Sequence, residues 1–448
     1  MNQKRITIKK STIKLALLLV LLKVTLDLAY VYIISPIYAY SGFTVLIHPV
    51  AVIESYILVF IIGLVLPFTI NRASHFLLWM LGVGALIPTL SYYAMHSGSR
   101  AYMYAMFLSF LCVVLVSKLP PVRISTLKEG RTIAIIVLVI MVFAVTASLI
   151  AKGGLSHFNL DLSKVYEHRR EVGAVISTGL WGYINTWVFK VINPALIGWA
   201  LWQKKYRLVA LFIALQVIFF GISSHKSVLF YPVLILAVYF FVKIPKALRY
   251  MTWGIIGIIV VSSLSTLLFD YNWLSSLFIR RVFFVPAQLN FAYYELFSEI
   301  GYVYLSNSVL SQLVHYPFPY PPQMMISNYL FGHYNTWANN GFLATSYMHF
   351  GYMGMLIFSA FVGLLFWLVD ILVHNRLPLW LGISIVAIPF FSLFTSADLS
   401  TALLTHGILI ALLILLIIGS SEQKVLLSNS NGGLHEKDLS SKFSSPPS

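Results

Sequence analysis

The stretch TIAIIVLVIMVFAVTASLIA, residues 132–151, contains twenty residues and no charged side chain. An α-helix rises about 1.5 Å per residue, so a run of this length crosses a hydrocarbon layer of roughly 30 Å. Comparable apolar runs recur along the chain. The sequence predicts twelve membrane-spanning helices, near residues 13–35, 50–69, 75–95, 101–118, 132–151, 180–202, 207–222, 227–243, 250–269, 346–371, 378–396 and 401–419.

The composition agrees with this interpretation. The 448 residues are 59% hydrophobic and 10% charged, and the mean hydropathy is +0.86. An ordinary soluble globular protein has about 25% charged residues, so that class is excluded. Strands of a membrane β-barrel would alternate over about ten residues, whereas these runs are continuously apolar and longer. We therefore expect an all-α polytopic membrane protein.

The net charge is +16, and the positions of the basic residues fit the positive-inside rule of membrane proteins better than a nucleic-acid-binding surface. With both termini in the cytoplasm, the predicted inner segments carry 20 of the 30 Lys and Arg residues. The N-terminal run contains Lys23 and Asp27 and lacks a small-residue cleavage site, which favours a membrane anchor over a signal peptide. We expect a membrane domain over residues 1–421 and a disordered cytoplasmic tail over 422–448.

Two long connections are predicted on the outer face, at about 152–179 and 270–345. The remaining basic residues lie within spans or on the outer side: Lys23, Arg100, Lys152, Lys164, Arg169, Arg170, Lys190, Lys226, Arg280 and Arg281. Lys23 and Asp27 are four residues apart, which favours a structural ion pair. Arg100 and Lys226 lie at predicted helix ends. There, a side chain that extends toward the lipid headgroups is as good an explanation as one that binds a ligand.

The paired arginines, Arg169–Arg170 and Arg280–Arg281, fit an anionic ligand better. Guanidinium groups donate fork-like hydrogen bonds to phosphate oxygens, so two such pairs could surround a pyrophosphate. Glu167 and Glu171 flank the first pair and could neutralise it. After Pro286, apolar residues recur at three- and four-residue spacing, which predicts an amphipathic helix that lies on, or dips into, the outer membrane surface.

Aromatic and amide side chains, the groups that recognise sugars, are concentrated downstream in YPFPYPPQ (316–323) and NTWANNGF (335–342). Interfacial aromatic residues are also ordinary in membrane proteins. The chain contains no P-loop, dinucleotide fingerprint, HExxH or paired cysteine motif. It also has no cytosolic segment large enough for a nucleotide site, so a donor would have to be activated already in the membrane.

The segment RRVFFVPAQLNFAYYELF (280–297) resembles the motif around an external-loop arginine in Wzy-type polymerases, which join O-antigen and capsule repeat units in bacteria. GISSHKSVLFYPVLIL (221–236) and NTWANNGFLATSYMHFGYMGMLI (335–357) are similar to further pieces of that family. The family's Arg- or His-x10-Gly pattern is met by His168 and Gly179, whereas the second arginine pair does not meet it. The resemblance implies a GT-C-like fold in the bacterial inner membrane.

It further implies transfer of a glycan from undecaprenyl pyrophosphate to a new lipid-linked repeat unit at the outer face, without a cofactor or metal. A chain-length regulator and a flippase would be partners, and nucleic acid would not. Arginines would stabilise the leaving pyrophosphate and a carboxylate or imidazole would accept the acceptor's proton. Carried to this sequence, the catalytic candidates are Arg280, Arg281, His168, His333 and Glu295, and the substrate-binding candidates are Arg169, Arg170, Arg100, Lys226, Tyr294, Asn339, Asn340 and His349.

Three alternatives remain at this stage. An O-antigen ligase shares the fold and the lipid donor, and only the order of motifs argues against it. A lipid-linked oligosaccharide flippase would place its charges within the spans and would not need an external connection of some 75 residues. A transporter of polar solutes would place charges at mid-membrane, where Lys23, Asp27 and Glu54 are the candidates.

Overall fold

The computed structural model describes residues 10–122, 130–156, 158–161, 179–308 and 310–419. Over these residues the secondary structure is helical and contains no strand. Seven of the helical stretches are long and apolar enough to cross a membrane, and four apolar helices of 10–17 residues accompany them. The predicted class, a helical multi-pass membrane protein, is confirmed.

Each predicted span corresponds to one helix or to consecutive helices. The first six segments are α1 (Lys10–Ala29) with η1 (Tyr30–Ile34), α2 (Ser35–Tyr38) and η2 (Ala39–Ser41), α3 (Pro49–Val65), α4 (Ala73–Leu81) with η3 (Gly82–Leu86) and α5 (Ile87–His96), α6 (Arg100–Val116), α7 (Gly130–Ala151), and α9 (Leu180–Trp187) with η4 (Val188–Ile192) and α10 (Asn193–Trp202). The last six are α11 (Tyr206–Ser223), α12 (Lys226–Phe241), α13 (Ala247–Phe269), α17 (Phe342–Val373), α18 (Leu379–Thr395), and α19 (Leu399–Leu404) with α20 (Ile408–Ile418).

Four wide, π-helical segments interrupt these helices, and a proline explains each of them. Pro36, Pro88, Pro194 and Pro286 each lie two residues beyond the end of η1, η3, η4 and η5 (Ser276–Phe284), respectively. A proline has no N–H, and its ring collides with the carbonyl four residues earlier. Widening the preceding turn to the π form moves that carbonyl away, so the helix continues with a local bulge.

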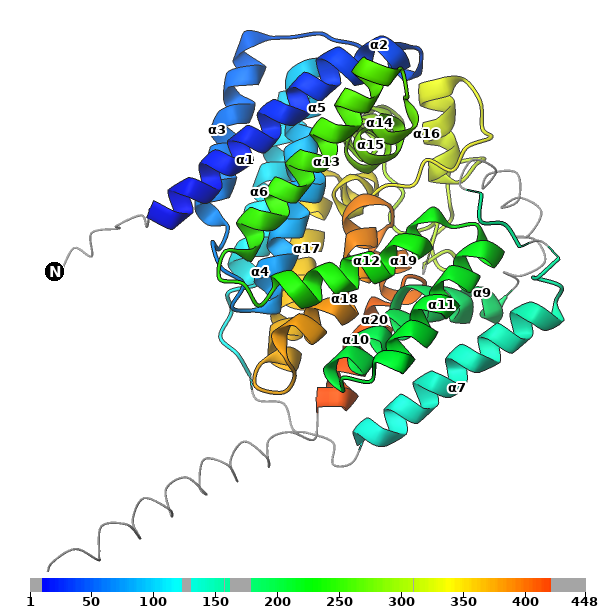
Figure 1. The fold of residues 1–448 in the computed structure, drawn as a ribbon. Helices are drawn as coiled ribbons and strands as arrows, with labels where there is room; N and C mark the ends of the chain where they lie inside the picture. Colours follow the sequence, from blue (N-terminus) through cyan, green and yellow to red (C-terminus); the bar gives the residue numbers. More distant parts are fainter. Residues whose placement is uncertain (1–9, 123–129, 157, 162–178, 309, 420–448) are drawn as a thin grey trace, which may run out of the picture.

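The helices form two groups (Figure 1). α1, α3, α5, α6 and α13 lie together in one half, and α7, α10, α11, α12, α18 and α20 lie in the other. α17 packs against α6 and also against α18 and α20, so it joins the halves. α14 (Trp273–Ser275), η5 and α15 (Val285–Ile300) form one continuous helical stretch, which Figure 1 views nearly end-on beside α13.

The connection predicted at 270–345 is largely helical. It contains α14, η5, α15 and α16 (Pro322–Phe331). A helix with Pro286 in its first turn is confirmed, because α15 begins at Val285. The helical stretch extends further back, to Trp273, and residues 287–293 are all buried within the protein, so this part of α15 does not present an exposed amphipathic face.

The polar residues of α15 indicated a side that faces water, but in the structure they form hydrogen bonds inside the protein. Gln288 Nε2 donates to the Ser41 carbonyl at 2.8 Å, and Asn290 Nδ2 donates to Thr89 Oγ1 at 2.9 Å. Buried amides that are satisfied in this way cost little, so a polar stripe does not require water. α15 consequently lies between α5, α16 and α17.

The predicted ion pair of Lys23 and Asp27 is confirmed. Lys23 Nζ lies 2.6 Å from Asp27 Oδ2, and the Lys23 side chain is fully buried. The hydroxyls of Tyr56 and Ser91 also donate to Asp27, at 2.8 and 2.6 Å. The carboxylate thus ties α1 to α3 and α5, and its role is structural.

Candidate functional site

The two adjacent arginines lie on η5, where the π bulge before Pro286 widens the helix. Ile279, Phe283 and Phe284 of this segment are buried, while Arg280 is half-buried and Arg281 is exposed. Arg280 stacks on Tyr38, and Arg281 also interacts electrostatically with Tyr38, so the two guanidinium groups share this neighbour. Burial of the aromatic face fixes the direction in which each arginine points.

Arg280 has a defined environment, and no carboxylate of the described residues forms an ion pair with it. Its guanidinium carbon lies 4.1 Å from the ring centre of Tyr38, and one terminal nitrogen donates to Ser276 Oγ at 3.2 Å. Its Nε is buried and has no acceptor in the described part of the chain. Stacking on an aromatic ring holds the guanidinium plane without neutralising its charge. The arrangement leaves a positive group with unused donor capacity.

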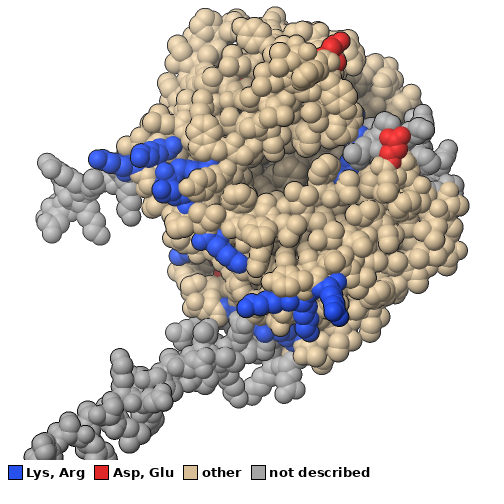
Figure 2. All heavy atoms as spheres, viewed as in Figure 1, with Lys and Arg blue, Asp and Glu red and all other residues tan. Residues whose placement is uncertain are grey.

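The start of α12 brings a second cation to this segment. Lys226 Nζ lies 5.9 Å from the ring centre of Trp273, and the rings of Phe230 and Phe278 are 6.2 Å apart. These contacts join α12 to α14 and η5. Figure 2 shows the surface hollowed between α13 and α14 on one side and α12 on the other, with a basic side chain on the wall of the hollow. Lys226 therefore lies at the start of a helix that contacts α14 and η5, and η5 is the segment that carries Arg280 and Arg281.

Glu295 belongs to a separate group at the far end of α15. The Tyr329 hydroxyl of α16 donates to Glu295 Oε2 at 3.1 Å. Partial burial raises the pKa of Glu295 above its ordinary value, and the bond from Tyr329 and the nearby His96 oppose that rise. A carboxylate with a raised pKa is a better proton acceptor than an exposed one, which suits the predicted base.

His333 is exposed and lies just after α16. Its ring stacks on Phe331, and its carbonyl accepts a bond from Ser327 Oγ at 2.8 Å. Asn339 is also exposed, whereas Asn340 is buried. Asn340 Nδ2 donates to the Asn290 side chain at 2.9 Å and to the Pro286 carbonyl at 3.1 Å. Asn340 therefore secures the turn before α17 against α15.

Tyr294 is part of a cluster of tyrosines from three helices. Its ring stacks on Tyr102 of α6, with centres 4.7 Å apart, and lies 4.9 Å from Tyr347 of α17. The Tyr352 hydroxyl donates to the Tyr294 hydroxyl at 3.4 Å. Nearby on α6, Arg100 forms an ion pair with Glu54 of α3. Glu54 thus offsets the charge of Arg100, whose side chain stays 65% exposed.

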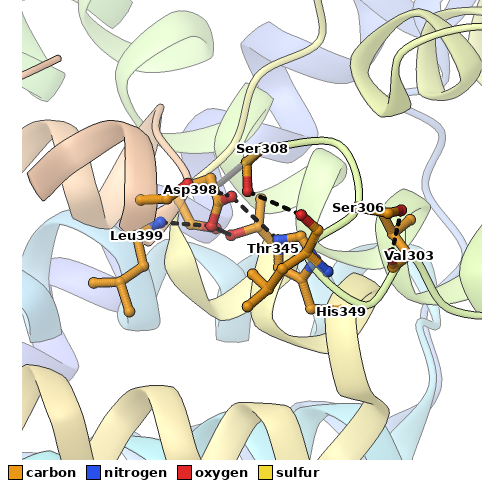
Figure 3. Close-up of polar contacts among 10 residues, drawn as sticks. Val303, Ser306, Ser308, Thr345, His349, Asp398 and Leu399 are labelled. Carbon is orange, nitrogen blue, oxygen red and sulfur yellow. Dashed lines mark hydrogen bonds and ion pairs between the residues drawn. The ribbon is translucent and has the colours of Figure 1, made fainter. Parts of the chain in front are cut away.

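His349 lies in α17 immediately before a break in the helix, and its ring is fully buried (Figure 3). Phe350 and Gly351 have non-helical backbone angles, and Gly351 adopts a φ of 59°, which glycine accepts readily. The freed carbonyls of Met348 and His349 accept bonds from the N–H groups of Val303 and Tyr304. The break thus docks the segment after α15 onto α17.

Both ring nitrogens of His349 are occupied. Nδ1 accepts the N–H of Leu305 at 3.1 Å, so the proton is on Nε2, which donates to Asp398 Oδ2 at 3.1 Å. Burial would raise the pKa of Asp398, but its bonds from His349, Leu399 and Ser400 outweigh burial and hold that pKa below its ordinary value. The pair joins α17 to the start of α19 and offers no free nitrogen to a ligand.

Sequence reasoning did not identify Asp398. The local signal was present, because an aspartate directly before an apolar run is typical of a helix N-cap, and Asp398 Oδ1 accepts the Leu399 N–H at 2.6 Å. Its pairing with a histidine 49 residues earlier has no local signal. The other three candidates, His168, Arg169 and Arg170, lie outside the described residues, as does the predicted tail at 422–448. Within the described residues no group of three His, Cys, Asp or Glu could hold a metal ion.

Comparison with known proteins gives no relative. No family model, no curated protein and no solved structure matches the chain. The functional argument consequently rests on the geometry of the described residues.

Proposed function

We propose that this protein is a polymerase that joins lipid-pyrophosphate-linked oligosaccharide repeat units at the outer face of the bacterial inner membrane. The observation that carries the proposal is the environment of Arg280. This half-buried guanidinium group stacks on Tyr38, and among the described residues it has no carboxylate partner and its buried Nε has no acceptor, which suits it to a phosphate oxygen. Lys226 lies at the start of the adjoining helix and adds positive charge.

The distribution of charge supports the orientation that the proposal requires. On the face in Figure 2, Lys and Arg side chains gather over the start of α1 and over the α10–α11 and α12–α13 connections. These segments belong to the predicted cytoplasmic side, and the hollow beside η5 lies away from them. Twelve spans, cytoplasmic termini and a GT-C-like arrangement are parts of the proposal.

In the proposed reaction the acceptor sugar hydroxyl attacks the anomeric carbon of the growing glycan. A bond forms between that oxygen and carbon, and the bond from the anomeric carbon to the pyrophosphate oxygen breaks. Lipid pyrophosphate leaves with the electron pair, which Arg280, Arg281 and Lys226 stabilise. The hydroxyl proton passes to a base, for which Glu295 and His333 are the candidates; Glu295 lies about four helical turns beyond Arg281 on the same helical stretch. His349 is a poor base because Asp398 and the Leu305 N–H occupy its nitrogens.

The experiment uses a strain that makes a surface polysaccharide and lacks the gene. It is complemented with the wild type, Arg280→Ala, Arg281→Ala or the control Arg207→Ala, whose arginine is exposed at the start of α11. Membrane protein levels are matched by immunoblotting, and glycans are separated on gels. We expect surface glycans of single repeats for Arg280→Ala and full-length chains for Arg207→Ala. Chains of unchanged length in both η5 variants would refute the pyrophosphate role.

The deletion strain itself separates the competing functions. A polymerase predicts single repeats on the surface. A ligase predicts full-length polymer that stays on the lipid carrier, and a flippase predicts loss of surface repeats with accumulation of lipid-linked repeats inside. Either of the last two patterns would overturn the proposal whatever the arginine variants do.

A further inference from the structure

A pocket of about 220 Å³ lies at the end of the bundle opposite the outer connections, between the end of α3, the start of α4 and the end of α6. Val65, Leu78 and Val114 form its apolar wall, and Arg72 and Lys118 are among its polar lining residues. A helix that crosses a bilayer meets the headgroup region at its ends. The pocket therefore combines an apolar wall and cationic groups at the depth where lipid headgroups lie.

The cationic groups of this pocket are available to a ligand. Arg72 and Lys118 are both exposed, and neither forms a hydrogen bond or ion pair with another residue that the structure describes. His75, also in the lining, donates from Nδ1 to the Thr69 carbonyl at 2.9 Å, which leaves Nε2 unused by that bond. Ser117 donates to the Val114 carbonyl of its own helix.

The nearest carboxylate does not cancel this charge by pairing. Asp370 of α17 accepts the Ser74 N–H at 2.8 Å and the Ser74 hydroxyl at 2.6 Å, so it caps the start of α4. It lines a neighbouring pocket of about 160 Å³, to which Arg72 also contributes, and it forms no ion pair with Arg72. Both of its oxygens are engaged by Ser74. The first pocket therefore keeps a positive rim.

We propose that this pocket binds the phosphate diester of an anionic glycerophospholipid. Arg72 and Lys118 contact the phosphate oxygens, and the glycerol and upper acyl carbons lie against Val65, Leu78 and Val114. The apolar wall distinguishes a lipid from free phosphate, because an inorganic ion would leave that wall unused. Basic pockets between transmembrane helices are suited to such headgroups. The pocket has no lining residue in η5, and the proposal does not depend on the proposed polymerase activity.

The test is native mass spectrometry of the detergent-solubilised full chain, titrated with phosphatidylglycerol or with phosphatidylcholine. We compare the wild type with Arg72→Gln/Lys118→Gln and with the control Lys204→Gln/Arg207→Gln, which removes two exposed cations outside the pocket. At about 1 kcal/mol for each basic residue, the first variant should lose phosphatidylglycerol affinity by about thirtyfold. The control should retain the wild-type affinity, and all proteins should keep the same melting temperature.

A second variant, Val65→Trp, fills the apolar part of the pocket and keeps both cations. It should lose phosphatidylglycerol binding as well, and 10-fold excess inorganic phosphate should not displace the lipid from the wild type. Equal affinity for the two lipids, or equal loss in the control, would overturn the proposal. Displacement by inorganic phosphate, or full binding by Val65→Trp, would show a simple anion site and would refute the lipid assignment.

Discussion

The role of His349 is tested by Asp398→Ala and His349→Phe, made singly and together. In the folded protein Asp398 accepts four hydrogen bonds. The donors are the Leu399 N–H at 2.6 Å, His349 Nε2 at 3.1 Å, Ser400 Oγ at 3.2 Å and Thr345 Oγ1 at 3.3 Å. Asp398 and His349 are buried, so water does not replace a lost partner. The substitution therefore removes a helix cap and leaves a buried imidazole without its acceptor.

The expected magnitude follows from these two losses. Removing an N-cap aspartate costs about 1 kcal/mol. Leaving a buried donor unsatisfied costs about 1–3 kcal/mol, so Asp398→Ala should lower the free energy of unfolding by about 2–4 kcal/mol. His349→Phe loses the same contact and also strands the Leu305 N–H, with a loss of similar size. Since both variants remove one shared bond, the double variant should fall short of the sum by about 1–2 kcal/mol.

The assay is equilibrium unfolding in detergent micelles, run beside glycan chain length at matched protein level. If His349 is structural, chain length should follow the amount of folded protein in all three variants. Two results would refute this reasoning. One is additivity within about 0.5 kcal/mol, which would mean that the contact between His349 and Asp398 contributes nothing. The other is a loss of polymer in His349→Phe with an unchanged unfolding free energy, which would assign His349 a chemical role.

Two further predictions concern other carboxylates. Because the pKa of Glu295 is raised in the folded protein, the folded state holds its proton more tightly, and stability falls as pH rises through that pKa. Glu295→Gln should thus melt higher than the wild type at pH 8, with the difference vanishing near pH 4; a pH-independent difference would contradict the shift. Lys23→Met strands the buried Asp27 and should cost about 3 kcal/mol in unfolding free energy, and adding Asp27→Asn should recover part of it. No recovery in the double variant would contradict a structural ion pair.

The positions of the membrane helices could be predicted from the sequence because the bilayer imposes a local rule. An apolar run such as residues 132–151 satisfies its backbone hydrogen bonds in the bilayer by forming a helix of spanning length, whatever the rest of the chain does. α7 occupies residues 130–151. The π segments also have a local cause, because each precedes a proline. The course of α15 could not be predicted. Its amides bond to Ser41 and Thr89, more than 200 residues away, and a sequence pattern does not show whether a polar group meets water or protein.

The candidate site, too, could be predicted from the sequence only in part. An arginine pair in a poorly charged chain is visible in the sequence, and so is its aromatic surrounding. The partners that distinguish one basic residue from another are remote. Arg100 meets Glu54 and Lys23 meets Asp27, whereas Arg280 meets the ring of Tyr38. From the sequence, these basic residues could be compared as ligand-binding candidates only by their positions in the predicted topology. The structure adds whether each one has a carboxylate partner that balances its charge.

The excess of basic over acidic residues makes this comparison informative. The chain has 14 acidic and 30 basic residues, so most of its basic residues lack an acidic partner within the protein. The buried carboxylates are occupied: Asp27 forms an ion pair with Lys23, Asp370 caps α4, and Asp398 accepts a bond from the His349 ring. The half-buried Glu54 forms an ion pair with Arg100. A half-buried guanidinium such as Arg280 cannot rely on bulk water as an exposed arginine does. Its charge is best balanced by an anion that arrives from outside, which is the property required of a pyrophosphate site.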